Sequence, residues 1–186
     1  MLKLSSIDDF KEALLLLDAR LEEIDAKPIQ IRAIGGFALM FHGLRGDKQT
    51  IDIDSLTKPF PQPVLDAVKR VGKELDLEED WLNTDCATLQ GFMRELAPKI
   101  NWLDTDYPLE KIDLKVADPL GLARSKAKAV HDGGLVPRGT DKEDIIRILL
   151  SFGIEDIGAL DANPDFAFIK ESYPRCYAFL AEAGTW

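Results

Sequence analysis

The sequence predicts a mixed α/β (α+β) protein in which a small mixed sheet is flanked by helices and followed by C-terminal helices. Short segments that alternate or are rich in β-branched residues lie between longer segments with apolar residues at helical spacing. After residue 118 only helical patterns remain. A chain of 186 residues with 46% hydrophobic content can bury one substantial core. We therefore expect a core over residues 1–118 and a helical part over residues 119–186 that packs on it as a single compact unit.

The chain opens on a predicted packing helix. Ser6 and Asp9 fit a capping box. The apolar residues that follow lie on one helical face: Ile7, Phe10, Leu14, Leu17, Leu21 and Ile24. After the break at Pro28, the segment IQIRAI predicts a buried strand that runs directly into Gly35 and Gly36.

The two glycines begin a predicted succession of turn, helix and strand. Residues 37–42 are long enough for a short helix, residues 43–46 hold turn signals, and TIDIDSL alternates as a strand does. A second amphipathic helix is predicted from Val64 to Leu75. Residues 81–108 have no clear period, and we expect a loop, a helix and an edge strand there.

The remaining elements are one strand and a series of helices. LEKIDLKVA alternates cleanly and predicts the strand. Asp118 and Pro119 then fit a cap followed by a first-turn proline. Thr140 and Glu143 fit a second capping box, and a terminal helix begins near Pro174. Between the first two of these helices, LVPRG matches a thrombin recognition sequence, which we interpret as a native loop.

Charge and composition exclude several classes of protein. The formal net charge of −10 argues against a broad surface that binds nucleic acid, so any RNA or DNA contact is expected to be local. Cys86 and Cys176 match no metal-ligand spacing, and the chain has two His, which argues against a zinc site. The first residues turn acidic at once, and no segment approaches ~18 consecutive apolar residues. We expect a cytoplasmic protein without a membrane partner.

Two acids in TIDIDSL form a candidate metal site. Successive side chains of a strand point to opposite faces, so Asp52 and Asp54 point the same way, while Ile51 and Ile53 face the other side. The two acids are roughly 6.5 to 7 Å apart along the strand. Mg²⁺ prefers oxygen ligands and keeps positions for phosphates and water, which suits such a pair. The alternative is a solvated strand face without function.

The glycine turn is a candidate phosphate site. Two glycines between a strand and a helix allow close backbone approach, and a helix N-terminus presents free N–H groups to an anion. Gly35 and Gly36 are therefore candidate nucleotide-binding residues, although a tight turn that needs positive φ would also explain them. Arg45 lies in the turn before the acids and could bind a phosphate bidentately. His42 is expected to cap carbonyls at the end of the helix.

These residues resemble a known family. A G-G pair, a short helix and then D-x-D on the next strand are similar to the signature of the DNA-polymerase-β-type nucleotidyltransferase superfamily, with Gly-Gly in place of the commoner Gly-Ser. The longer string GGFALMFHGLR, followed by TIDID, resembles AbiEii-like and related bacterial nucleotidyltransferases, some of which are toxins of type IV toxin–antitoxin systems. The turn LRGDKQT is slightly longer than the usual stretch before the acids.

Further matches lie downstream in the order of the family. Lys111-Ile112-Asp113 resembles its K-x-D motif, and Lys126 resembles its helical lysine. Asp141 or Asp144 resembles its final acidic motif. The run WLNTD at residues 81–85 also resembles a related uncharacterised group and is a candidate for the acceptor side. Together the matches span roughly residues 29–150.

The resemblance implies a nucleotidyltransferase fold and a role for each matching residue. Asp52 and Asp54 would bind two Mg²⁺ ions, roughly 3.5 to 4 Å apart, that hold the triphosphate of an NTP. Asp113 would be the third carboxylate and metal ligand, although the polar face of a strand is the alternative. Lys126 would neutralise triphosphate charge, unless it is one of several solvated basic residues. Asp141 and Asp144 would belong to the nucleotide site, although acids are common in the first turns of a helix anyway.

The leading functional hypothesis is a Mg²⁺-dependent nucleotidyltransferase. It would transfer an NMP from an NTP to a hydroxyl of RNA, such as tRNA, or of a protein, and could be a toxin with an antitoxin protein as partner. The overall acidity fits poorly with a large RNA acceptor. One alternative is a catalytically inactive binding or interaction module with the same fold, and another is a metal-dependent phosphohydrolase.

Overall fold

A computed structural model describes residues 6–46, 49–89, 91–133 and 139–186 of the chain. These residues form a mixed α/β structure, which confirms the predicted class. The chain divides into two compact units, Met1–Asp118 and Pro119–Trp186. The packing of the two units as a single compact body stays a prediction. Residues 135–138 of the LVPRG stretch lie outside the described residues.

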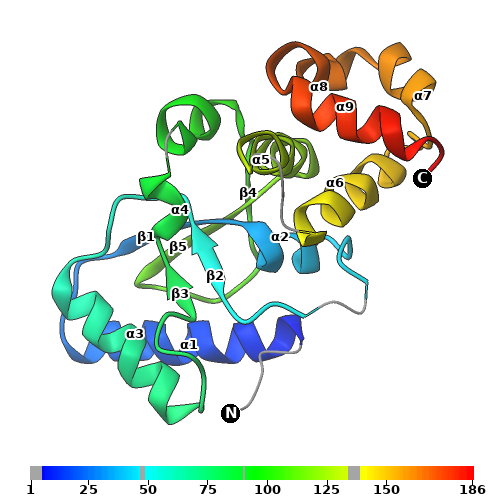
Figure 1. The fold of residues 1–186 in the computed structure, drawn as a ribbon. Helices are drawn as coiled ribbons and strands as arrows, with labels where there is room; N and C mark the ends of the chain where they lie inside the picture. The colour runs from blue at the N-terminus through cyan, green and yellow to red at the C-terminus, as the bar shows by residue number, and fades with distance from the viewer. Residues whose placement is uncertain (1–5, 47–48, 90, 134–138) are drawn as a thin grey trace. The chain divides into compact units, whose positions relative to one another are not determined.

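The first unit contains the sheet and the helices around it (Figure 1). Its strands are β1 (Ile29–Ile34), β2 (Ile53–Ser55), β3 (Leu82–Asn83), β4 (Trp102–Asp104) and β5 (Ile112–Ala117). Its helices are α1 (Ile7–Glu23), α2 (Gly35–Phe41), α3 (Gln62–Glu74) and α4 (Asp85–Thr88), with a π-helical turn η1 (Phe92–Leu96) and a 3₁₀ turn η2 (Ala97–Lys99).

The sheet has five strands in the order β3-β2-β1-β5-β4. β1 pairs in parallel with β5 and antiparallel with β2, β3 is parallel to β2, and β4 is antiparallel to β5. The sheet is therefore mixed, as predicted. Its centre is formed by β1 and β5, which lie about 80 residues apart in the sequence and match residue for residue from Ile29 and Ile112 onward.

One face of the sheet is apolar and the other carries polar side chains. The apolar face is buried and is made by alternate residues of three strands: Ile29, Ile31, Ala33, Ile53, Ile112, Leu114 and Val116. The intervening positions Gln30, Arg32, Asp113 and Lys115 are exposed or half-buried. This period of two orients every candidate site residue on the strands.

Helices α1 and α3 pack on each other and lie together on one side of the sheet (Figure 1). α1 begins with the predicted capping box, in which Ser6 and Asp9 each accept a backbone N–H of the other. Its buried face carries Phe10, Ala13, Leu14, Leu17 and Leu21. Arg20 bridges to Glu74 at the end of α3 with a 2.8 Å ion pair.

The second unit is helical. It contains α5 (Pro119–Asp132), α6 (Gly139–Ser151), α7 (Ile157–Ala162), a 3₁₀ turn η3 (Pro164–Phe166), α8 (Ala167–Ser172) and α9 (Pro174–Ala183). α6 already begins at Gly139, so Thr140 lies inside the helix and is not its cap. Across the described residues, no helix combines the length and the apolar character that a membrane crossing requires.

Candidate functional site

Gly35 brings the glycine turn and the acid pair together. α2 begins at this residue, whose φ of +67° strains any side chain. A Cβ placed here would lie 2.6 Å from Oδ2 of Asp54. The Asp54 carboxylate therefore occupies the space that the missing side chain leaves, and the two predicted halves of the site lie in contact.

Gly36 is enclosed by two other side chains. A Cβ at this position would collide with Nη1 of Arg45 and would lie 2.5 Å from Oγ1 of Thr50. Thr50 is buried, whereas Arg45 is half-buried and its buried Nε atom has no hydrogen-bond partner among the described residues. The side-chain space at both glycines is thus filled by protein groups, and phosphate binding by the glycines stays a prediction.

The two acids share the polar face of the sheet, as the alternation predicts. Asp54 pairs with Ile34 of β1 on one side and with Asn83 of β3 on the other. Asp52 directly precedes β2, and both acids are half-buried, while Ile53 between them is fully buried. Ile51 is 50% exposed and does not reach the apolar face, because the strand begins only at Ile53.

The Asp52 carboxylate is held from two sides. Oγ1 of Thr50 donates a hydrogen bond of 3.0 Å to Oδ1 of Asp52. Nδ2 of Asn83 lies 3.5 Å from Oδ2, at the outer limit of a hydrogen bond. Oδ1 of Asn83 in turn accepts the N–H of Asp85, so the WLNTD run is tied directly to the acid pair.

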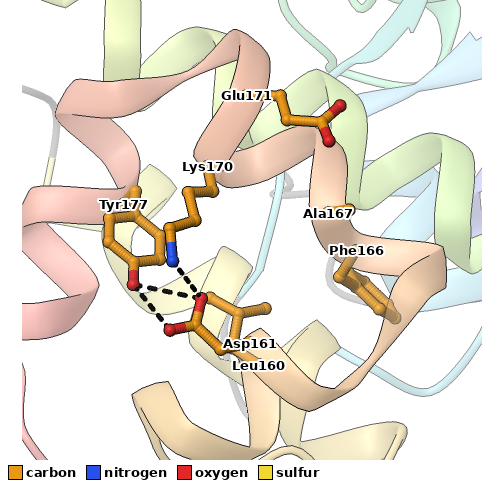
Figure 2. Close-up of a pocket in the computed structure, with 7 residues that line it drawn as sticks. All are labelled: Leu160, Asp161, Phe166, Ala167, Lys170, Glu171 and Tyr177. Carbon is orange, nitrogen blue, oxygen red and sulfur yellow. Dashed lines mark hydrogen bonds and ion pairs between the residues drawn. The ribbon is translucent and has the colours of Figure 1, made fainter.

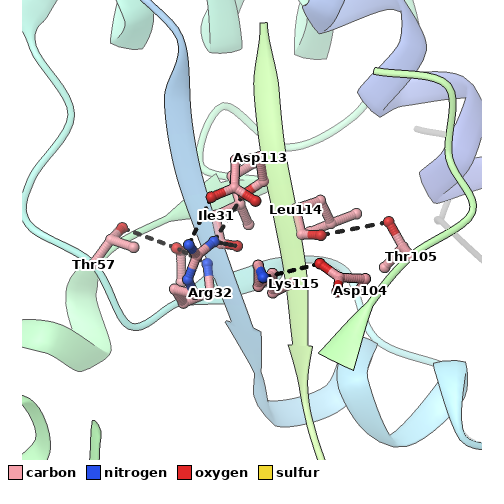
Figure 3. Close-up of polar contacts among 9 residues, drawn as sticks. Ile31, Arg32, Thr57, Asp104, Thr105, Asp113, Leu114 and Lys115 are labelled. Carbon is pink, nitrogen blue, oxygen red and sulfur yellow. Dashed lines mark hydrogen bonds and ion pairs between the residues drawn. The ribbon is translucent and has the colours of Figure 1, made fainter. Parts of the chain in front are cut away.

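Asp113 does not lie with the acid pair. It is level with Gln30 in the register of β1 and β5, whereas Asp54 is level with Ile34. Four residues along a strand correspond to about 13 Å. Figure 3 shows Asp113 facing Arg32, whose Nη2 lies 2.7 Å from its Oδ2. The carboxylate of Asp113 is thus engaged by a guanidinium and is displaced from the predicted metal site.

Arg32 is an additional residue on this face. Its Nη1 also donates to the backbone oxygens of Ile31 and Asp113, so the guanidinium ties β1 to β5. The neighbouring Lys115 forms a 2.9 Å ion pair with Asp104 of β4 (Figure 3). Both cations of this part of the sheet therefore have an acidic partner.

Two carboxylates, and not three, are the candidate metal ligands on this face of the sheet. Within the described ranges, no group of three or more His, Cys, Asp or Glu side chains converges in a way that could hold a metal. Asp52 and Asp54 supply carboxylate oxygens on one face, which is the chemistry that Mg²⁺ takes when water and phosphate oxygens complete its coordination. A two-metal site stays a prediction.

Lys126, Asp141 and Asp144 meet within the second unit. Nζ of Lys126 on α5 lies 2.8 Å from Oδ1 of Asp141 and 2.8 Å from Oδ2 of Asp144, both on α6. Lys126 is buried and Asp144 is completely inaccessible to solvent. One ammonium thus faces two carboxylates, and the cluster as it stands has no positive charge left over for a phosphate.

A small pocket in the second unit is lined by none of the predicted site residues (Figure 2). It is lined by Leu160, Asp161, Phe166, Ala167, Lys170, Glu171 and Tyr177. Lys170 and the Tyr177 hydroxyl both donate to Asp161, which lowers the pKa of this carboxyl, and the same contact raises the pKa of Lys170. These three polar groups bind one another, so the pocket presents no unpaired charge among them.

Comparison with protein-family models, with curated proteins and with solved structures found no match for this chain.

Two residues of the site were not predicted from the sequence. Thr50 lies two residues before Asp52, and strand alternation would have placed its hydroxyl on the same face. Arg32 lies in the alternating segment IQIRAI, at a position that faces away from the core. The signal in both cases is the period of two, but it does not tell which strands become neighbours.

Proposed function

We propose that this protein is a Mg²⁺-dependent nucleotidyltransferase with a nucleotidyltransferase fold. The observation that carries the proposal is the contact between Gly35 and the Asp54 carboxylate, because it joins the glycine turn to the acid pair in one site. The mixed sheet with α2 between β1 and β2 supports the same assignment. The transferred group is an NMP, and pyrophosphate is released.

The proposed reaction is a displacement at the α-phosphorus of an NTP. The hydroxyl oxygen of the acceptor forms a bond to this phosphorus, the bond to the bridging oxygen of the β-phosphate breaks, and the acceptor proton passes to solvent. Mg²⁺ would neutralise charge on the triphosphate and orient it. Asp52 and Asp54 would hold the ion, and Arg45, which lies beside Gly36, would bind phosphate oxygens.

The direct test uses labelled NTPs. The protein is incubated with each α-³²P-labelled NTP, Mg²⁺ and total RNA or total protein, beside an Asp52→Ala/Asp54→Ala variant. The expected result is label on one acceptor class with the wild type alone. Equal labelling by wild type and variant, or no labelling with any NTP and acceptor, would contradict transfer.

A second candidate function is a nucleotide-binding module without transfer activity. The observation that favours it is the displacement of Asp113, since a site with two carboxylates lacks the ligand that would hold an acceptor-side metal. Titration calorimetry with Mg²⁺ and each NTP distinguishes the two candidates. Metal-dependent NTP binding without transfer supports the module, and binding together with transfer supports the enzyme.

Asp113 provides the matched control for this comparison. An Asp113→Asn variant is expected to bind Mg²⁺ and NTP as the wild type does, because Asp113 lies against Arg32 and not with the acid pair. An Asp54→Asn variant is expected to lose that binding. If both variants lose it equally while remaining folded, Asp113 belongs to the metal site after all.

A further inference from the structure

The second glycine of the turn has an unexpected neighbour. Thr50 fills the space beside Gly36, since a Cβ added to Gly36 would lie 2.5 Å from Oγ1 and 2.7 Å from Cβ of Thr50. Thr50 is 7% exposed, so its hydroxyl must find a partner within the protein. That partner is Oδ1 of Asp52, at 3.0 Å.

We propose that Thr50 is a positioning residue that orients the Asp52 carboxylate for metal binding, with Asn83 as its counterpart on the opposite oxygen. This inference rests on the proposed function, because it assigns a task at the same acid pair. Gly36 is then required to let Thr50 approach, which gives the second glycine a purpose other than phosphate binding.

The geometry explains why such support is needed at Asp52. Asp52 precedes β2 and therefore lacks the strand pairing that holds the backbone of Asp54. A residue outside a paired strand loses more conformational freedom on metal binding than a residue whose backbone is already held by strand pairing. Donors on both carboxylate oxygens remove part of that freedom in advance, and each oxygen keeps a further lone pair for the ion.

A matched pair of variants tests the proposal. Thr50→Val removes the hydroxyl and keeps the branched shape, whereas Thr50→Ser keeps the hydroxyl and removes a methyl group. Binding of Mn²⁺ alone is measured from the electron paramagnetic resonance signal of the free ion, with Asp52→Asn/Asp54→Asn as the background. We expect Thr50→Val to raise the Kd about tenfold and Thr50→Ser to leave it near the wild-type value.

The outcomes separate the inference from the function on which it rests. If Thr50→Val is folded by circular dichroism and binds Mn²⁺ as tightly as the wild type, the positioning role is wrong and the proposed function stands. If the wild type binds no more Mn²⁺ than Asp52→Asn/Asp54→Asn does, the proposed metal site itself fails.

A third variant covers the case in which Thr50→Val does not fold. Asn83→Ala removes the amide near Oδ2 of Asp52 from a half-buried position and leaves the core untouched. It is expected to raise the Kd for Mn²⁺ as well, by a smaller factor than Thr50→Val, because its contact is longer. An unchanged Kd in a folded Asn83→Ala protein would then overturn the proposal.

Discussion

At the scale of single residues, Lys126 is a buried cation that pairs with two carboxylates. Its side chain is 11% exposed, that of Asp144 is fully buried, and their charged atoms lie 2.8 Å apart. No group in the described part of the chain donates a well-aligned hydrogen bond to either oxygen of Asp144, so the ion pair with the ammonium of Lys126 is its main compensation. A buried carboxylate that loses such a partner is left as an uncompensated charge.

Substitution of Lys126 is therefore expected to act on stability. Lys126→Met should lower the free energy of unfolding by about 3–5 kcal/mol, because Asp144 then remains buried without its cation. Urea denaturation followed by circular dichroism measures the change. Lys170→Met is the control, since Lys170 pairs with Asp161 at the surface and should change stability little. Equal losses in the two variants would contradict the assigned role of burial.

Lys126 is also a candidate residue of the proposed nucleotide site. The resemblance to the AbiEii-like family implies that Lys126 neutralises triphosphate charge, but its ammonium is held by two acids in the second unit. The resemblance assigned Lys126 to one motif and Asp141 or Asp144 to another. It did not indicate that they bind one another, because residues on different helices become neighbours only through tertiary packing.

At the scale of elements, the turn between β1 and α2 can be tested with two glycines of similar conformation. Gly35 and Gly43 have φ values of +67° and +68°, but a Cβ at Gly43 would meet nothing within 4 Å. Alanine at either position should cost about 1–2 kcal/mol of backbone strain. The additional contact at Gly35 is with the end of the Asp54 side chain, which can rotate away.

The two alanine variants should consequently differ at the site and not in the fold. We expect similar midpoints of thermal unfolding for Gly35→Ala and Gly43→Ala. Binding of Mn²⁺ should be weakened by Gly35→Ala alone, because Asp54 is displaced there. A normal Mn²⁺ affinity in Gly35→Ala would show that the Asp54 carboxylate is not held against the glycine.

The elements with long, regular patterns were predictable from the sequence. The capping box and apolar stripe located α1, and the β-branched residues after Pro28 located β1. Alternation located β5, although this strand begins at Ile112, later than predicted. The π-helical turn η1 and the short strand β3 have no comparable signal, since two to five residues cannot establish a period. The short helices α7 and α8 belong to the predicted helical part, but their individual positions were not predicted.

The position of Asp113 shows where sequence reasoning ends. Alternation predicts that Asp113 lies on the polar face of its own strand, and the register of β2, β1 and β5 puts Asp54 on the same face of the sheet. The level of Asp113 along the sheet depends on which residue of β1 lies beside it, and that residue is Gln30. Register between strands so distant in sequence is set by the packing of the apolar face, which a local pattern does not encode.

For the whole molecule, the buried thiols predict how stability depends on pH. Burial raises the pKa of Cys86 to about 12, with further contributions from the charges of Asp54 and Asp85, and burial alone raises that of Cys176 to about 12. The ordinary value is 9.0. As the pH rises above this value, thiols of the unfolded chain ionise while those of the folded chain remain neutral, so the free energy of unfolding falls until the folded thiols ionise too.

Both units should report this effect, because Cys86 lies in the first and Cys176 in the second. Urea denaturation of the wild type and of Cys86→Ala/Cys176→Ala at pH 7.5 and pH 10 measures it. We expect the free energy of unfolding to fall more for the wild type than for the variant between pH 7.5 and pH 10. This expectation holds whatever the difference in stability between the two proteins at pH 7.5. The same loss in both proteins would mean that the thiols ionise equally in the folded and unfolded chains.

The burial of Trp81 has a practical consequence. Its indole N–H donates to the backbone oxygen of Val68 at 2.9 Å, and its own backbone oxygen accepts the N–H of Ile53, the residue between the two acids, at 2.7 Å. The other two tryptophans, Trp102 and Trp186, are half-buried. The protein thus carries an intrinsic fluorophore that is hydrogen-bonded to the acid strand. Because Trp81 is fully buried, we expect its emission to be blue-shifted and to offer a label-free optical signal for events at Asp52 and Asp54.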